Sequence, residues 1–261
     1  MNWIEANGAS LRYELAGEGK PTLVLIHEAG GAIESWDYLL PGLQAKFRTL
    51  RYDQRGFGLS EKFRGPLTVD AVVADLAALL DALNITEPCH VLGGAFGAAM
   101  GIAFAARHPA RVARLVACNP APGVTGDARR YVEERAKTVE REGMRPMADL
   151  SLSNSYPENL RRDKARWEKY RLRWLSNDPA CFAALNWMVG SMDLVPDYAR
   201  VRCPTLVIAG IHDKLRAPEV IRKIADAIPG SQFVVADSGH FMAVQDPEML
   251  LEHALPFLCA K

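Results

Sequence analysis

Short apolar runs alternate with helical patterns along most of this chain. The runs are rich in β-branched residues and bounded by turn residues, which is typical of buried parallel strands. They cover Thr22–Ile26, Thr49–Tyr52, Cys89–Leu92, Leu115–Cys118, Leu206–Ala209 and Phe233–Ala236. An earlier segment, in which Leu11, Tyr13 and Leu15 alternate with polar residues, predicts a half-exposed strand.

Apolar residues at helical spacing predict helices between these strands. Val69–Leu83 and Pro218–Ile228 show that spacing, and Asp246 followed by Pro247 has the pattern of an N-cap that opens a last helix. Alternation of strands and helices indicates βαβ units, so we expect a mostly parallel sheet flanked by helices.

The alternation stops in residues 122–198. Charge density rises there, and three helices without an intervening strand are expected, over Asp127–Glu142, Glu158–Leu175 and Ala180–Met188. The chain is therefore predicted to have an α/β core made of residues 1–121 and 199–261. Residues 122–198 are predicted to form a helical cap, inserted after the sixth strand.

Composition excludes several classes of protein. Of the 261 residues 49% are hydrophobic, enough for the core of one large domain with an insertion. Basic and acidic residues number 31 each, so the charge balance argues against nucleic acid or an anionic membrane as a partner. No apolar run approaches the roughly 20 residues that a membrane span needs.

The sequence lacks the patterns of a signal peptide and of a metal site, which bears on the expected compartment and cofactors. Met1 to Glu5 lack the basic and apolar regions of a signal peptide, and the 5 cysteines are scattered. Both observations predict a cytoplasmic protein with free thiols. No His, Cys or carboxylate cluster has the spacing of metal ligands, so neither a metal nor another cofactor is expected. The sequence favours no particular oligomeric state.

A tight strand-to-helix turn follows the run Cys89–Leu92. It reads Gly93-Gly94-Ala95-Phe96-Gly97 and precedes a run of small residues typical of a buried helix. In a nucleophile elbow the central residue is strained, and the positions two before and two after it must be nearly free of side chain. Gly93 and Gly97 satisfy that requirement. The central residue, however, is Ala95, which carries no hydroxyl or thiol.

Two further residues follow strands in the order that a catalytic triad needs. Asp213 lies in a turn after the strand that ends at Ala209, and His240 lies in a loop after the strand that ends at Ala236. Functional residues gather at the carboxyl ends of parallel strands. We expect His240 to take a proton from a nucleophile or water, and Asp213 to orient it. An aspartate or a histidine alone is common in a turn or loop, and only the three positions in triad order indicate a site.

The loop His27–Gly31 follows the first long strand. Its glycines let the chain reverse, which suits an oxyanion hole built from backbone amides. The expected donors are the amides of Phe96 and of Ala29 or Glu28. Glu28 is unexpected, since a carboxylate would repel an oxyanion. Its side chain therefore either turns to solvent or a cation, or contacts the substrate or the catalytic groups.

Candidate wall residues of a substrate pocket are Trp36, Trp187 and Met188. Trp36 follows the oxyanion loop, and the other two lie on the apolar cap helix. The alternative is that the tryptophans only pack the cap against the core. The second cap helix is basic, and one or two of its cations, between Arg161 and Arg173, could bind a substrate carboxylate.

These motifs together resemble the α/β-hydrolase superfamily along essentially the whole chain. The matching segments are His27–Gly31, Tyr52–Ser60, Gly93–Gly97, Gly210–Asp213 and Gly239-His240. Within the superfamily the chain is most similar to the small bacterial subgroup that contains 3-oxoadipate enol-lactonases, in the segments Asp53–Gly56, Asp75–Leu83 and Pro204–Gly210.

The resemblance implies the α/β-hydrolase fold, with an eight-stranded, mostly parallel sheet. It also implies a cytoplasmic, cofactor-independent hydrolase whose partner is a small-molecule substrate. That substrate would be an ester, lactone or amide, with or without a carboxylate group, and the reaction would use a Ser-His-Asp or Cys-His-Asp triad.

Ala95 and Glu28 depart from the pattern of active members, and three hypotheses remain open. In the first, the chain is an inactivated mutant of a hydrolase whose serine or cysteine nucleophile was replaced by Ala95. The retained turn, Asp213 and His240 favour it. In the second, a natural enzyme without a serine nucleophile uses His240 and Asp213 as a base on water or on a substrate proton. In the third, the protein binds a ligand without catalysis.

Overall fold

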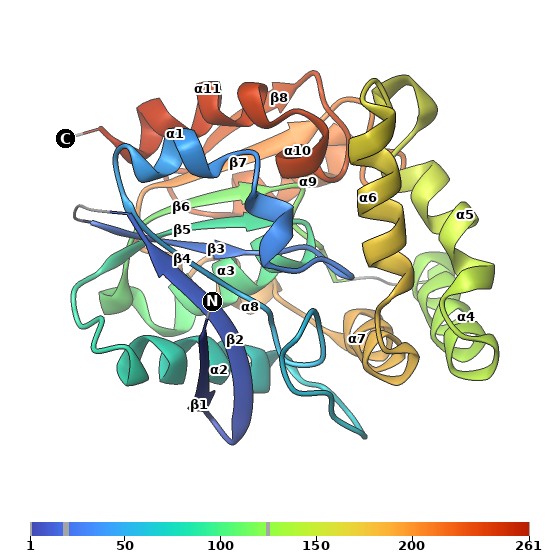
Figure 1. Ribbon diagram of the computed structural model, residues 1–261. Coiled ribbons are helices and arrows are strands. Elements are labelled where there is room, and N and C mark those ends of the chain that lie inside the picture. Colours follow the sequence, from blue (N-terminus) through green and yellow to red (C-terminus); the bar gives the residue numbers. More distant parts are fainter. Residues whose placement is uncertain (1, 18–20, 124–125, 261) are drawn as a thin grey trace.

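An eight-stranded sheet forms the centre of the computed structural model, which describes residues 2–17, 21–123 and 126–260 (Figure 1). The strand order is β1-β2-β4-β3-β5-β6-β7-β8. β2 pairs antiparallel with β1 and β4, and the other pairings are parallel. The strands are β1 (Asn2–Ala6), β2 (Ala9–Ala16), β3 (Thr22–Ile26), β4 (Arg48–Tyr52), β5 (Cys89–Gly94), β6 (Val112–Cys118), β7 (Thr205–Gly210) and β8 (Gln232–Ala236).

The predicted α/β fold with a mostly parallel sheet is confirmed. β1 is the one strand of the described residues that the hydrophobic pattern did not predict. Ala6 is its single buried residue, so β1 carries almost no hydrophobic signal. Its pairing with β2, which joins Asn2 to Tyr13, supplies the order that the sequence does not show.

Helices cover both faces of the sheet. They are α1 (Leu40–Gln44), α2 (Val69–Ala82), α3 (Phe96–Arg107), α9 (Pro218–Ala227), α10 (Met242–Gln245) and α11 (Pro247–Leu258). All residues of β3 are buried, with Val24 and Ile26 in the hydrophobic cluster under α2, α3 and α9. Leu23 and Leu25 point to the cluster under α1 and α11. A strand between two layers buries both of its faces, hence the continuous apolar run.

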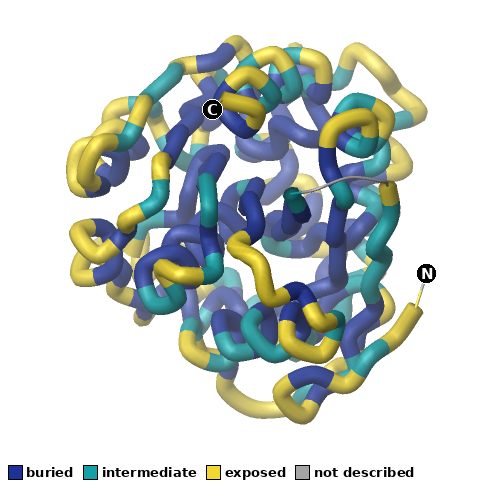
Figure 2. Tube along the Cα trace, turned by 90° about the vertical axis from the view of Figure 1, so that its left-hand side faces the viewer, coloured by how far each residue is buried: buried dark blue, intermediate teal, exposed yellow. Residues whose placement is uncertain are grey.

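The segment between β6 and β7 is helical. It holds α4 (Gly126–Glu142), α5 (Arg145–Ser155), α6 (Lys164–Leu175), α7 (Pro179–Ser191) and α8 (Val195–Tyr198). α4 to α7 lie together beyond one end of the sheet, whereas α8 lies against α3, where Arg107 and Asp197 are joined by a 2.8 Å ion pair (Figure 1). Figure 2 shows the buried trace gathered at the centre and the exposed segments around it. The division into core and cap units stays a prediction.

The helix expected over Glu158–Leu175 is wrong at its start. A short 3₁₀ turn, η3 (Glu158–Leu160), precedes the helix, which begins at Lys164. Asp163 has an extended backbone, and its side chain accepts a 2.9 Å hydrogen bond from the amide of Arg166. An aspartate N-cap of this kind starts a new helix. α5 was missed because small and polar residues make up part of its buried face, as at Ala148, Ser151 and Ser155.

Candidate active site

Ala95 lies at the sharp turn between β5 and α3. Its φ of 51° and ψ of −108° place a residue with a side chain in a strained conformation. A Cβ atom on Gly93 would lie 2.6 Å from the Cα of Ala98, and one on Gly97 would lie 2.1 Å from the carbonyl oxygen of Ile26. Both glycines are therefore required by close backbone approach. The turn has the geometry of a nucleophile elbow without its nucleophile.

Glycine at position 95 should relieve this strain. We expect Ala95→Gly to raise the free energy of unfolding by about 1 kcal/mol, because relief of the positive φ exceeds the added entropy of the unfolded chain. Urea denaturation measures it. Ala98→Gly, three residues further on in α3, is the matched control and should lower the stability by about 1 kcal/mol. A lower free energy of unfolding in both variants would contradict the claim that the backbone at Ala95 is strained.

Asp213 and His240 meet at the carboxyl ends of β7 and β8. His240 Nδ1 lies 2.6 Å from Asp213 Oδ2. The other carboxylate oxygen, Oδ1, accepts hydrogen bonds from the amides of Leu215 and Arg216 at 2.9 and 3.1 Å. A carboxylate that is fixed in this way accepts the Nδ1 proton. The tautomer that results leaves His240 Nε2 as a hydrogen-bond acceptor.

The electrostatics of this pair favour a neutral imidazole beside an ionised carboxylate. Burial lowers the pKa of His240, and the Arg216 charge lowers it further, although Asp213 opposes them. Burial by itself would raise the pKa of Asp213, but the attraction of His240 and its hydrogen bond make the overall change a lowering. His240 is thus in the state in which it can accept a proton.

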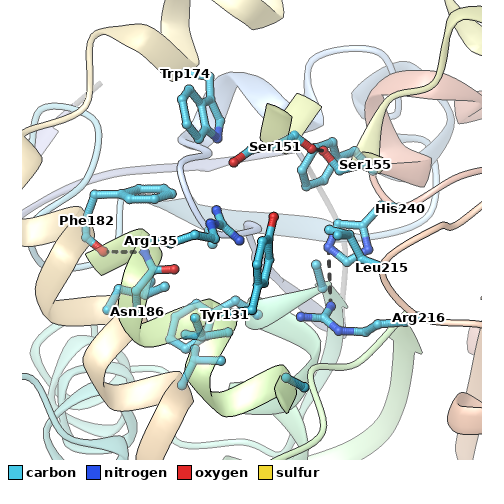
Figure 3. A pocket seen from close by; sticks show the side chains of 18 residues that line it. Tyr131, Arg135, Ser151, Ser155, Trp174, Phe182, Asn186, Leu215, Arg216 and His240 are labelled. Carbon is cyan, nitrogen blue, oxygen red and sulfur yellow. Dashed lines mark hydrogen bonds between the residues drawn. The ribbon is translucent and has the colours of Figure 1, made fainter. Parts of the chain in front are cut away.

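Arg216 lies against Nε2 of His240 and was not among the site residues predicted from the sequence. Its Nη1 is 3.3 Å from His240 Nε2 (Figure 3). The same nitrogen donates to the carbonyl oxygen of Asn119 at 3.0 Å. Burial lowers the pKa of Arg216 to about 10, and the nearby Arg135 acts in the same direction. The available signal was its place three residues after Asp213, in the same turn.

The two amides expected to bind an oxyanion lie at the same cavity wall as Ala95. Phe96 is the first residue of α3, so its amide has no acceptor within the helix. Ala29 lies in a turn closed by a 2.9 Å hydrogen bond from the amide of Gly31 to the oxygen of Glu28. Both residues line the cavity together with Ala95. The arrangement can hold a carbonyl oxygen near the elbow.

Glu28 is buried rather than directed to solvent. Its Oε1 accepts a 2.8 Å hydrogen bond from Ser35 Oγ and lies 3.7 Å from Arg173 Nη2. A Cβ atom on Gly31 would lie 2.6 Å from the same oxygen, so glycine is needed there for the carboxylate to fold back. Of the alternatives for Glu28, the structure shows the contact with a cation. Its charge also acts on His240, whose pKa it raises.

Ala95 and His240 line a cavity of about 160 Å³. Figure 3 shows His240 at one side of it and Trp174, Phe182 and Arg135 at the other. Core residues form one side of it. The helices inserted between β6 and β7 supply the other side, including Tyr131, Arg135, Ser155, Trp174, Phe182 and Asn186. Aromatic and apolar groups dominate that side, and few polar groups converge on the cavity, as is usual for small-molecule sites.

Arg135 of α4 is the second candidate site residue that was not predicted from the sequence. Its guanidinium carbon lies 5.8 Å from the ring centroid of Tyr131 and 6.0 Å from that of Phe182. Within the described ranges no carboxylate lies at ion-pair distance from it, and its Nε has no hydrogen-bond partner. Burial lowers its pKa. The Nε atom of this partly buried side chain is itself buried, and a cation in such a position without a counter-ion is costly, which indicates a site for an anion.

Comparison with known proteins agrees with this geometry. The family model described as alpha/beta hydrolase fold matches residues 21–247. The chain belongs to the alpha/beta hydrolase fold family. The resemblance inferred from its motifs is confirmed, including similarity to an enol-lactonase.

Three relatives of this α/β hydrolase illustrate the similarity. The crystal structure of the enol-lactonase from Burkholderia xenovorans LB400 is 29% identical, covers 99% of this chain and 100% of that chain, and has a TM-score of 0.94. A thermophilic esterase from Thermogutta terrifontis, with malate bound, is 28% identical over 99% and 98% of the chains, with a TM-score of 0.92. "Putative carbamate hydrolase RutD" from Caulobacter sp. (strain K31) is 29% identical over 92% of this chain and 91% of its own.

The structure does not bring the three predicted wall residues to the cavity beside Ala95 and His240. Trp36 packs in the cluster under α1 and α11 and lines only a void of about 10 Å³ beside His240. Trp187 and Met188 line a separate groove, where Trp187 Nε1 donates to Glu140 Oε1 at 2.9 Å. The side of α7 that faces the cavity carries Phe182, Leu185, Asn186 and Val189. Because α7 is apolar nearly all round, its sequence does not indicate which side faces the site.

The basic cap helix also differs from expectation. Arg173 of α6 donates to Ser35 Oγ at 2.9 Å, and Arg166 lies over the ring of Tyr38, 4.2 Å from its centroid. Neither residue lines the cavity beside Ala95 and His240, where the cation from this segment is Arg135 of α4. Within the described part of the chain no group of three potential metal ligands occurs, and no helix there is long and apolar enough to cross a membrane.

Proposed function

We propose that this α/β hydrolase cleaves a small ester, lactone or amide that carries a carboxylate group. The observation that carries the proposal is the 2.6 Å contact of His240 with Asp213, which leaves a basic nitrogen at the cavity beside Ala95. The names of three relatives, an enol-lactonase, an esterase and a carbamate hydrolase, support acyl transfer to water as the reaction class.

The roles follow from the positions of the groups. The substrate carbonyl oxygen would accept hydrogen bonds from the amides of Ala29 and Phe96. Because Ala95 cannot form an acyl-enzyme, the attacking group would be water. His240 would take its proton as the hydroxide adds to the carbonyl carbon, and Asp213 would stabilise the imidazolium. The same proton would then pass to the leaving oxygen or nitrogen as the tetrahedral intermediate breaks down.

Arg135 supports an anionic substrate. A guanidinium in an apolar wall, without a carboxylate partner in the described residues, matches the planar geometry of a substrate carboxylate. The esterase from Thermogutta terrifontis has malate, a dicarboxylate, bound in its structure. We therefore assign Arg135 of α4, and not a residue of the basic helix α6, as the candidate partner of a substrate carboxylate.

The contact between Arg216 and His240 bears on the three hypotheses for Ala95. Arg216 Nη1 lies 3.3 Å from His240 Nε2, the nitrogen that would accept a proton from a nucleophile or from water. The contact therefore hinders the base in both catalytic hypotheses, and the natural enzyme without a serine nucleophile stays a prediction. The inactivated mutant stays a prediction. A covered base also keeps a non-catalytic binding protein as the second candidate.

Replacement of His240 tests the proposal. We expect the protein to hydrolyse monomethyl adipate faster than methyl hexanoate, which has the same acyl length and no charge. His240→Ala should lower that rate about 100-fold, because a general base contributes at least this factor. A pH-stat measures the release of acid.

His212→Ala is the matched control, since this half-exposed histidine pairs with Asp237 at 2.7 Å. Its rate should equal that of the parent. Equal rates in the parent and in His240→Ala would remove His240 from the mechanism. No hydrolysis by the parent, together with binding of adipate, would favour the binding protein.

A further inference from the structure

The atom at which a triad histidine contacts its nucleophile is covered in this protein. In such a triad the ring nitrogen that does not contact the aspartate accepts a hydrogen bond from the nucleophile's hydroxyl. Here Arg216 Nη1 lies 3.3 Å from that nitrogen, His240 Nε2 (Figure 3). A guanidinium can only donate, so this contact occupies the lone pair with which His240 would take a proton.

Arg216 is held in this position from both ends. Its amide donates to Asp213 Oδ1 at 3.1 Å, and its Nη1 donates to the oxygen of Asn119 at 3.0 Å. Asn119 is itself fixed, since it donates to Gly239 O at 2.8 Å and accepts from the amide of Gly210 at 2.8 Å. The contact is therefore part of a built network and not a free side chain resting on a ring.

Arg135 and Arg216 line the same cavity as His240. Their like charges oppose each other, and Arg135 has no carboxylate partner among the described residues. A carboxylate between the two guanidiniums would reduce their repulsion and give Arg135 a counter-ion. A hydrogen bond from guanidinium to carboxylate is also stronger than one to a neutral imidazole nitrogen.

We propose that Arg216 blocks His240 in the free protein and leaves it when the carboxylate of a bound substrate pairs with Arg135 and Arg216. The inference rests on the proposed function, because it takes the substrate to be a carboxylate-bearing acyl compound. Its consequence is selectivity at the base: a neutral analogue can enter the cavity, but it leaves Nε2 covered.

The charged groups around the two side chains set the sign of the expected change. His240 faces Asp213 and Arg216 from its neighbouring loop and Glu28 from the oxyanion loop, and Arg135 acts through Arg216. Tyr198 also acts on Arg216. Of these, Arg216 disfavours protonation of His240, whereas Asp213 and Glu28 favour it. A carboxylate that withdraws Arg216 should therefore make His240 easier to protonate.

Titration of the His240 ring by NMR tests this coupling without turnover. Adipate is the probe, and adipamide, of the same length and without charge, is its control. We expect saturating adipate to raise the proton affinity of His240 about tenfold in the parent, and adipamide to leave it unchanged. In Arg216→Met the affinity should already be raised without ligand, and adipate should add little.

Two further variants complete the design. Lys214→Met removes an exposed cation from the same loop and should behave as the parent does. Arg216→Lys keeps the charge and serves where the methionine variant does not fold, and it should reduce the response to adipate. An equal response to adipate in the parent and in both Arg216 variants would overturn the proposal.

The two proposals fail in different ways. If adipate leaves His240 unchanged while monomethyl adipate is still hydrolysed through His240, Arg216 does not control the base and the hydrolase function stands. If His240 responds to adipate through Arg216 but no ester is cleaved, the coupling stands and the protein is a carboxylate-binding member of the fold.

Discussion

Ala95→Ser is expected to raise the rate of hydrolysis of monomethyl adipate about 1000-fold. A serine in the elbow would attack the carbonyl from a fixed position, which is worth far more than attack by a water molecule. His240, released from Arg216 by the substrate carboxylate, would accept the serine proton. For methyl hexanoate we expect a gain below about tenfold, because Arg216 stays on His240. Initial rates at saturating ester measure both.

The matched control is Ala98→Ser, a change at a buried alanine of α3 that should leave the hydrolysis rates unaltered. Ala95→Cys supplies a different nucleophile and should raise the rates as Ala95→Ser does. Arg216→Met added to Ala95→Ser should extend the gain to the neutral ester. Equal large gains on both esters with Arg216 in place would instead support an inactivated mutant. No gain on either ester in any variant would show that a side chain at position 95 does not act as the nucleophile beside His240, and attack by water would remain the proposed mechanism.

Gly97→Ala is expected to lower the free energy of unfolding by about 4 kcal/mol, an exceptional loss for the addition of one methyl group. The new Cβ would lie 2.1 Å from the oxygen of Ile26 and 2.5 Å from that of His27. Both are backbone atoms at the end of β3, so neither can rotate away. Relief would require α3 to move from the sheet, together with the amide of Phe96. Urea denaturation measures the change.

Gly94→Ala is the control for Gly97→Ala, because among the described atoms none lies within 4 Å of the Cβ it would add. Its φ is not positive. We expect its stability to stay within about 1 kcal/mol of the parent. Similar losses in both variants would show that the cost is a general property of the turn, and not the approach of α3 to β3.

The fold was largely readable from the sequence because its sheet is buried on both faces. In β3, Leu23 and Val24 face opposite layers, so apolar residues run without interruption and mark the strand. Where burial is partial the signal fails, as in β1 and in α5, whose buried face includes Ser151 and Ser155. The start of α6 was misplaced because its N-cap, Asp163, lies within a continuous run of charged residues and does not stand out in the sequence.

The site was readable only in part, for a related reason. Asp213 and His240 follow strands of a parallel sheet, and the order of those strand ends brings them together whatever surrounds them. Arg135 and Arg216 had no such marker. On a charged helix or in a polar turn an arginine is typical of a solvated surface, and only the packing of α4 over the core places Arg135 inside.

Three features could be predicted from the sequence alone: the parallel sheet, the elbow that Gly93 and Gly97 permit around Ala95, and the chain order of Asp213 and His240. Those features depend on local spacing and on hydrophobic periodicity, which a single sequence carries. Three others became visible in the three-dimensional structure: Glu28 is buried beside Ser35 and Arg173, Trp187 and Met188 line a separate groove, and Arg216 covers His240. Those outcomes depend on which side of a helix or loop meets a distant segment, and that is set by packing across the whole fold.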